Sequence, residues 1–417
     1  MQRLNSRVGV LSFLLAATLA ACSPSTSTPE IANTDPASWV IVGGNVAPEV
    51  IAFLQPTPMS ESRVVASRND RTILRLRESE LDTLASFFHD RFERCGGFTA
   101  HDSLAEAESV IESEARMALQ ANQVTESAPL VAAAPDVVQA LIPLVSAPQI
   151  VSTINGLVAF GTRHYRSTGG VQSATWLRDR WAAMAVGRAG ATATLFAHSA
   201  WPQPSVMLTI PGDEAPNEVV VIGGHLDTIN SNGSANAPGA DDDASGVATL
   251  TEVARLILSQ NVRLRRTVIF MAYAAEEVGL RGSAAIANDF RARNVPVVGV
   301  MQLDMTNFDG SPHDIVLITD NVSTTQTDFL ATLAARYIPQ FPVARDRCGY
   351  ACSDHASWTR AGYPAVLPHE ATLATGNPNI HTSRDTLSVS GNNANHAAKF
   401  AKLAIAYTVE MAQVPAN

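Results

Sequence analysis

Charged residues are scarce in this chain, and it has no excess of basic residues. Asp, Glu, Lys and Arg make up 16% of its 417 residues, and the formal net charge is −10. This acidic balance argues against a nucleic-acid partner and against a polybasic patch that binds a membrane surface. Apolar residues make up 46% of the chain, so a sizeable core can be buried, and the length suits two or three domains.

An apolar run near the N-terminus is too short to cross a bilayer comfortably. Residues 8–19 form this run, and Arg3 and Arg7 precede it, which is typical of a signal peptide. The run ends in Leu-Ala-Ala-Cys, which is typical of a bacterial lipobox that is cleaved before Cys22. We therefore predict a lipoprotein signal peptide over residues 1–21 and lipid attachment at Cys22. Ordinary secretion, with cleavage near the same place, is the alternative.

Either route takes the protein out of the cytosol. Ser23 after the cysteine is typical of an outer-membrane address. We expect an outer-membrane or cell-surface lipoprotein, or a protein released to the periplasm or the extracellular space after processing. Its only contact with a membrane would be through the lipid. In an oxidising compartment Cys348 and Cys352 are close enough in the chain to bridge, which leaves Cys95 as a buried free thiol.

Composition divides the rest of the chain into four parts. They are a tether rich in Ser, Thr and Pro over 22–36, a small α+β module over 37–122, a linker over 123–135 and a larger domain over 136–417. In the small module we predict strands at 39–42 and 72–76, and capping patterns predict helices at 79–92 and 103–121. We find no chemical constellation in this module and interpret it as a structural or pro-domain-like unit, whose removal on maturation stays open.

The larger domain alternates apolar strands with helical segments. The apolar runs that suit buried strands are residues 205–210, 219–223, 267–273, 297–303 and 315–318. Residues 246–259 and 394–411 have the spacing of apolar residues that is typical of helices. This alternation predicts a three-layer α/β sandwich with a mixed, mostly parallel sheet.

Side chains that bind metals follow three of these predicted strands. His225, the pair Glu276-Glu277 and Asp304 each come just after a strand, where open α/β sheets bind ligands. One aspartate of the run 241–243, before a predicted helix, and His381 in a late loop complete a set of five. Imidazole and carboxylate ligands suit zinc. Two histidines, two terminal carboxylates and one shared carboxylate suit two zinc ions that each keep an open position.

Two further carboxylates have a predicted task. Adjacent glutamates at a strand end point in different directions, so one of Glu276 and Glu277 can bind metal while the other acts as a general base. Asp227 lies on the same side of an extended chain as His225 and can accept the second imidazole N–H. A surface aspartate is the alternative reading of Asp227.

Five segments, in one order, resemble the secreted two-zinc leucyl aminopeptidases of marine and soil bacteria. They are residues 223–227, 238–246, 271–283, 302–307 and 380–382, and the similarity extends over about residues 140–412. The resemblance implies that His225 and Asp304 bind one zinc and that Glu277 and His381 bind the other. It also implies that Asp242 bridges both ions and that Glu276 is the general base.

The resemblance extends to the substrate pocket. It implies a Cys348–Cys352 disulfide beside a pocket lined by Met305, Ile318, Tyr350, Leu367, His369, Leu373 and Ile380. In the family, larger aromatic rings stand where this chain has His369, Leu373 and Gly376. We therefore expect a roomier or more polar pocket.

These patterns predict a monomeric zinc aminopeptidase that acts on peptides with a free N-terminus. A related di-zinc carboxypeptidase needs a basic residue for the substrate carboxylate, and we find no arginine tied to the motifs beyond Arg281 and Arg384. A one-zinc glutaminyl cyclase or a non-catalytic binding lipoprotein predicts a lost ligand or base, and none is lost.

The adjacent Ser353-Asp354-His355 cannot converge as a catalytic triad. We interpret the remaining histidines, His89 among them, as structural or exposed.

Overall fold

A computed structural model describes residues 35–54, 63–92, 96–121, 130–231 and 236–415. The span Pro36–Asn417 forms one compact unit. The predictions for the signal peptide, for Cys22 and the tether up to residue 34, for Cys95 and for much of the linker lie outside the described residues.

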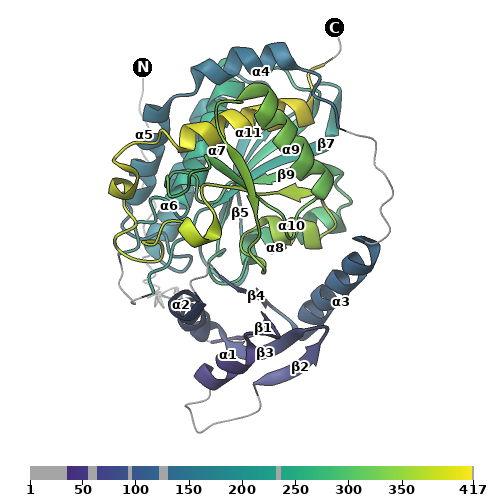
Figure 1. Ribbon diagram of the computed structural model, residues 1–417, viewed down its shortest axis with the longest axis vertical. Coiled ribbons are helices and arrows are strands. Elements are labelled where there is room, and N and C mark those ends of the chain that lie inside the picture. The colour runs from purple at the N-terminus through teal and green to yellow at the C-terminus, as the bar shows by residue number, and fades with distance from the viewer. Residues whose placement is uncertain (1–34, 55–62, 93–95, 122–129, 232–235, 416–417) are drawn as a thin grey trace, which may run out of the picture. The chain divides into compact units, whose positions relative to one another are not determined.

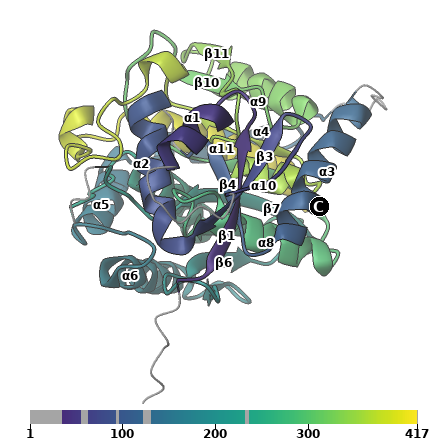
Figure 2. The same cartoon turned by 90° about the horizontal axis from the view of Figure 1, so that it is seen from below.

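The small module contains a four-stranded antiparallel sheet. Its order is β2-β3-β1-β4, formed by Val64–Arg68, Arg71–Arg77, Ala37–Gly43 and Phe98–His101. Because successive side chains alternate across a strand, Val40 and Val42 of β1 face one way and Ile41 faces the other. The helices α1 (Ala47–Leu54) and α2 (Leu81–Phe92) cover the first face, and α3 (Leu104–Ala121) covers the second (Figure 2).

The larger part of the chain is built on a six-stranded mixed sheet. Its order is β12-β9-β7-β8-β6-β5, formed by Ala365–Val366, Val297–Gln302, Ala215–His225, Arg266–Tyr273, Ser205–Ile210 and Thr192–Phe196. The strands β12, β9, β7 and β8 are parallel, and β6 and β5 continue the sheet in antiparallel pairs. The carboxyl ends of β9, β7 and β8 therefore meet at one edge of the sheet.

Helices cover both faces of this sheet (Figure 1). One face packs against α4 (Pro135–Leu141), α5 (Ala147–Val158), α6 (Thr168–Ala185), α7 (Ala244–Ser259), α9 (Thr324–Tyr337) and α11 (Ala397–Ala412). The other face packs against α8 (Arg281–Ala292) and α10 (His355–Arg360). Along β7, Val220 and Ile222 lie in the first core, whereas Val219 and Val221 lie in the second. The three-layer α/β sandwich with a mixed, mostly parallel sheet is confirmed.

A third sheet has the order β11-β10-β13 and lies apart from the main one. It is formed by Val343–Asp346, Ile315–Ile318 and Pro368–His369. The run 315–318 is a strand, as predicted, but it pairs with β11 and β13 and not with the main sheet.

Buried charges connect the small module to the rest of the unit. Glu78 of the module is 2% exposed, and its carboxylate accepts hydrogen bonds from Arg281 and from Arg166, the latter at 2.7 Å. The Arg281 guanidinium also donates to Asp102 at 2.9 Å and lies 4.4 Å from the ring centre of Trp201. Because an unpaired buried charge is costly, these contacts favour one fixed arrangement.

Among the described residues, no single helix is long and apolar enough to cross a membrane, and one bent pair of helices, Pro135–Leu144 with Ala147–Val158, passes by length and composition alone. Apolar residues of both segments lie in the core on the α7 face of the main sheet.

Candidate metal centre

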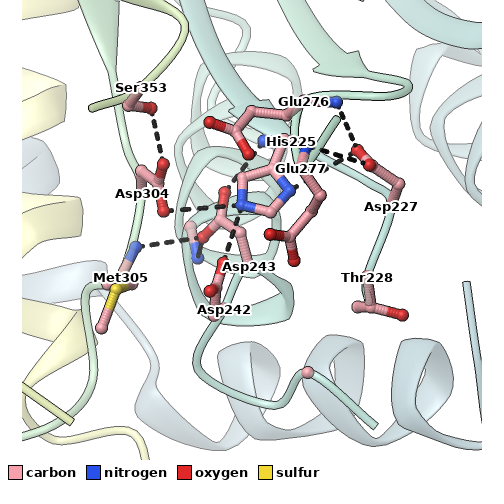
Figure 3. A network of polar contacts seen from close by, with 12 residues as sticks. His225, Asp227, Thr228, Asp242, Asp243, Glu276, Glu277, Asp304, Met305 and Ser353 are labelled. Carbon is pink, nitrogen blue, oxygen red and sulfur yellow. Dashed lines mark hydrogen bonds and ion pairs between the residues drawn. The ribbon is translucent and has the colours of Figure 1, made fainter. Parts of the chain in front are cut away.

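The predicted ligands converge at the carboxyl ends of adjacent strands. His225 ends β7, Glu276 and Glu277 follow β8, and Asp304 follows β9. Figure 3 shows these side chains gathered around one point, with Asp242 reaching them from the loop before α7. His381, in a loop before α11, also contacts the group. The structure therefore brings together all five residues that the sequence suggested.

Asp242 lies between two histidine–carboxylate pairs. Its Oδ1 is 2.8 Å from Nε2 of His225, and that nitrogen is 3.6 Å from Oδ1 of Asp304. Its Oδ2 is 3.2 Å from Nε2 of His381, and that nitrogen is 2.7 Å from Oε2 of Glu277. One oxygen of Asp242 thus faces each pair, which is the arrangement a bridging carboxylate needs.

The cluster is rich in buried negative charge. None of the five residues is more than 6% exposed. Burial raises the pKa of Glu276 well above its usual range, and Asp354, Asp304 and Glu277 add to this, while His225 opposes it. Burial also raises the pKa of Glu277, against the opposing effect of His381. A bound cation would favour the ionised carboxylates, so the residues present fit a metal site.

The two histidines hold the central carboxylate in its ionised form. Although burial favours the protonated form, hydrogen bonds from His225 and His381 keep the pKa of Asp242 below its usual range. His225, Asp242 and Glu277 each offer a ligand atom within 4.8 Å of the others, and His225 with Asp243 and Asp304 does so as well.

Asp227 contacts the pair of glutamates more closely than it contacts the histidine. Its Oδ1 accepts the backbone N–H of Glu276 at 2.9 Å, and its Oδ2 accepts that of Glu277 at 3.2 Å. The distance from Oδ1 to Nδ1 of His225 is 3.6 Å. Asp227 therefore fixes the turn that aims the two glutamates, a contact that the sequence reasoning missed.

Two residues that sequence reasoning did not identify hold the metal-site loops. Asp243 accepts the backbone N–H groups of His225 at 2.9 Å, of Gly246 at 2.8 Å and of Met305 at 3.2 Å. The guanidinium of Arg163, only 1% exposed, donates to three backbone carbonyls, those of Leu226, Pro238 and Gly239. The contact of Asp243 with Gly246 is a local N-cap of α7, but its other two partners and all three partners of Arg163 are distant in the sequence, so no local signal marks those contacts.

A pocket of about 450 Å³ opens beside Asp304. Of the predicted lining residues, it contains Met305, Tyr350, Leu367, His369, Leu373 and Ile380, together with Gly376. Ile318 is instead fully buried and packs in a cluster with Cys352 and Leu367 behind that lining. A disulfide joins Cys348 to Cys352, and both cysteines line the pocket.

The adjacent Ser353-Asp354-His355 makes no triad. Ser353 Oγ donates to Asp304 Oδ2 at 2.5 Å, and Asp354 Oδ2 accepts from Gln302 at 3.1 Å. Neither ring nitrogen of His355 has a hydrogen-bond partner in the described part of the chain. Ser353 instead orients a predicted metal ligand.

The small module reaches the same site. His89 of α2, interpreted from sequence as structural or exposed, has its ring centre 4.8 Å from that of His381. His89 and Asp90 both line the pocket. The sequence of the module shows no chemical constellation because the contribution of the module depends on contacts with distant loops.

Comparisons with known proteins agree with this site. A family model described as peptidase family M28 matches residues 205–407. The "Probable leucine aminopeptidase 1" of Trichophyton verrucosum (strain HKI 0517) is 35% identical over 294 residues, which cover 67% of this chain and 77% of that protein. Together with the buried cluster of ligands, these matches define a metal-dependent aminopeptidase.

Two crystal structures of Legionella pneumophila proteins are similar over most of the chain. The LapA aminopeptidase has a TM-score of 0.77 at 28% identity and covers 92% of this chain and 100% of that one. LapB has a TM-score of 0.77 at 29% identity, and the match covers 90% of this chain and 99% of LapB. The chain belongs to peptidase family M28, as the resemblance in its motifs predicted. A match limited to residues 136–417 would cover a much smaller share of this chain than these two structures do. Both matches therefore include counterparts of the small module.

Proposed function

We propose that this protein removes the first residue of peptides with a free N-terminus by using two zinc ions. His225 and Asp304 would hold one ion, Glu277 and His381 the other, and Asp242 both. The observation that supports this proposal most strongly is that the two oxygens of Asp242 face different histidines, at 2.8 and 3.2 Å. A single-metal site needs no such arrangement.

When bound, zinc in such a site polarises the substrate carbonyl and lowers the pKa of a nearby water. The chain itself supplies the proton transfer. Oε1 of Glu276 is buried and has no hydrogen-bond partner among the described residues, so it is free to accept a proton. Asp227 fixes the backbone of Glu276. Glu276 would take a proton from the attacking water and give it to the leaving amine.

The carboxypeptidase alternative is not favoured. Arg281 is paired with Glu78 and Asp102 in the small module. Arg384 donates from Nε to the side chain of Asn379 at 3.1 Å. Neither arginine lines the pocket beside the metal cluster, where a substrate carboxylate would have to bind.

A panel of aminoacyl anilides tests the activity. We expect the purified protein to hydrolyse free-amine substrates, to lose this activity on chelation and to regain it with zinc. N-acetylated versions of the same anilides should not be cleaved. Cleavage of N-blocked peptides without activity on any free-amine substrate would contradict the proposal.

We also propose that the protein is exported, lipidated at Cys22 and monomeric. The lipobox-like sequence before Cys22 supports lipidation, and the disulfide between Cys348 and Cys352 suits an oxidising compartment. Mass spectrometry of the mature N-terminus should find a lipid on Cys22, and Cys22→Ala should prevent that modification. An unmodified N-terminus beginning elsewhere would support ordinary secretion. Light scattering of the delipidated protein should give the mass of one chain.

A further inference from the structure

Helix α2 of the small module forms part of the substrate pocket. His89 and Asp90 line it together with residues of the larger part of the chain. Asp90 is exposed, so its carboxylate lies at the solvent-facing side of the pocket. The pocket is therefore completed by a segment outside the residues 205–407 that match the family model.

The inner walls suit a long side chain with a polar end. Met305, Leu367 and Ile380 provide apolar surface for methylene groups. Nδ1 of His369 lies 2.8 Å from the carbonyl oxygen of Ala371. The pocket thus offers apolar walls, the imidazole of His369 and one carboxylate at its solvent-facing side.

No positive side chain balances that carboxylate. The described pocket lining contains Asp90 and Asp304 but no lysine or arginine. Arg91, which follows Asp90, donates to Glu49 at 2.7 Å and is 59% exposed. Asp304 is already assigned to the metal centre, so Asp90 is the acidic group available to a substrate.

We infer that Asp90 makes this enzyme prefer peptides whose first residue is lysine or arginine. Such side chains bury their methylenes on apolar surface and keep the charged end near water. This matches a pocket with apolar walls and a carboxylate at its solvent-facing side. The inference rests on the proposed function and adds a specificity residue that comes from the small module.

Lysyl and norleucyl anilides provide the matched test, because their side chains have similar length and differ in charge. We expect Asp90→Asn to lower kcat/KM for the lysyl substrate by about fivefold, the size expected for one partly exposed ion pair. The norleucyl value should stay unchanged. Glu112→Gln removes the same charge from an exposed site on α3 and should change neither value. Added salt should lower the wild-type preference for lysine and leave that of Asp90→Asn unaffected.

Three outcomes would overturn the inference. If Asp90→Asn lowers kcat/KM equally for both anilides, Asp90 acts on the α-amine that both substrates share or on the fold. If the variant raises kcat/KM equally for both, α2 obstructs the site. An effect that follows the second residue, measured with leucyl-lysine and leucyl-leucine amides, would place the charge elsewhere along the peptide. Failure of the proposed function is distinguishable, because the wild type would then hydrolyse neither anilide.

Discussion

The small module and the larger part of this chain contribute to one site in different ways. The larger part supplies all five predicted ligands from the ends of three parallel strands and two loops, and its motifs were visible in the sequence. The small module supplies a face of α2 to the pocket and a buried ion-pair network, and no motif marks it. The chemistry of the site can therefore be read from local spacing in the sequence, whereas the shape of its pocket depends on long-range packing.

Changes to the reacting side chains of the larger part should therefore abolish turnover without unfolding the protein. The sharpest case is Glu276→Gln, which keeps the shape of the side chain and removes its basicity. We expect kcat to fall by about 10²–10⁴-fold, the usual contribution of a general base. Bound zinc, measured by atomic emission, should stay at the wild-type level. Loss of metal would mean that Glu276 is a ligand and that its role was misassigned.

The three adjacent aspartates provide the next contrast. Asp242→Asn should bind fewer zinc ions than the wild type, because only Asp242 faces both histidines. Asp243→Asn should instead lower the free energy of unfolding by about 1–3 kcal/mol, because an amide side chain cannot accept all three backbone N–H groups and leaves a buried donor unpaired. We would measure the bound zinc of both purified variants and their chemical denaturation, with no metal added in either experiment. These two measurements separate the metal-binding role of Asp242 from the structural role of Asp243. The assignment is wrong if the two variants show the reverse pattern.

Changes to the buried ion pairs of the small module should alter stability while leaving turnover intact. Glu78→Gln leaves Arg281 buried with Asp102 as its remaining carboxylate partner. Breaking such a pair typically costs about 3–5 kcal/mol, so the variant should unfold at clearly lower denaturant. Turnover per folded molecule should stay close to that of the wild type. Glu112→Gln, on the exposed face of α3, serves as the control and should change neither quantity. A large loss of kcat in folded Glu78→Gln would show that the module takes part in the chemistry.

The same pair predicts a smaller effect of pH on stability. Burial opposes ionisation of Glu78, but Arg281, with hydrogen bonds from Ser38 and Arg166, lowers its pKa below the ordinary value of 4.5. A lowered folded-state pKa stabilises the protein above the unfolded-state pKa, and this contribution is lost as the pH falls through the folded-state value. The difference in unfolding free energy between wild type and Glu78→Gln should therefore shrink below pH 4.5. A difference that stays constant into strong acid would contradict this.

Much of the fold and the site could be predicted because the signals are local. Apolar runs placed β6 and β10 with the bounds that the structure gives, and strand ends placed His225 and Asp304. The choice of Asp242 among three neighbours came only from the resemblance, since one residue of shift changes which carboxylate faces the cluster.

The remainder depends on contacts between distant segments. Nothing near His89 indicates that its ring will lie beside that of His381. In the same way, β10 pairs with β11 and β13, which lie 25 or more residues further along the chain, and its own apolar run does not indicate these partners. The three carbonyls that Arg163 holds lie in the connection between β7 and α7, at least 63 residues further along the chain, and no spacing rule joins them to Arg163.

The proposed function requires two zinc ions that act together at one bridging carboxylate. The most direct measurement removes metal by chelation and then adds zinc in steps, following bound zinc per chain and hydrolysis of norleucyl anilide together. We expect two zinc ions to bind per chain, with full activity restored only when both are bound. Full activity with one zinc bound and no second binding event would contradict it.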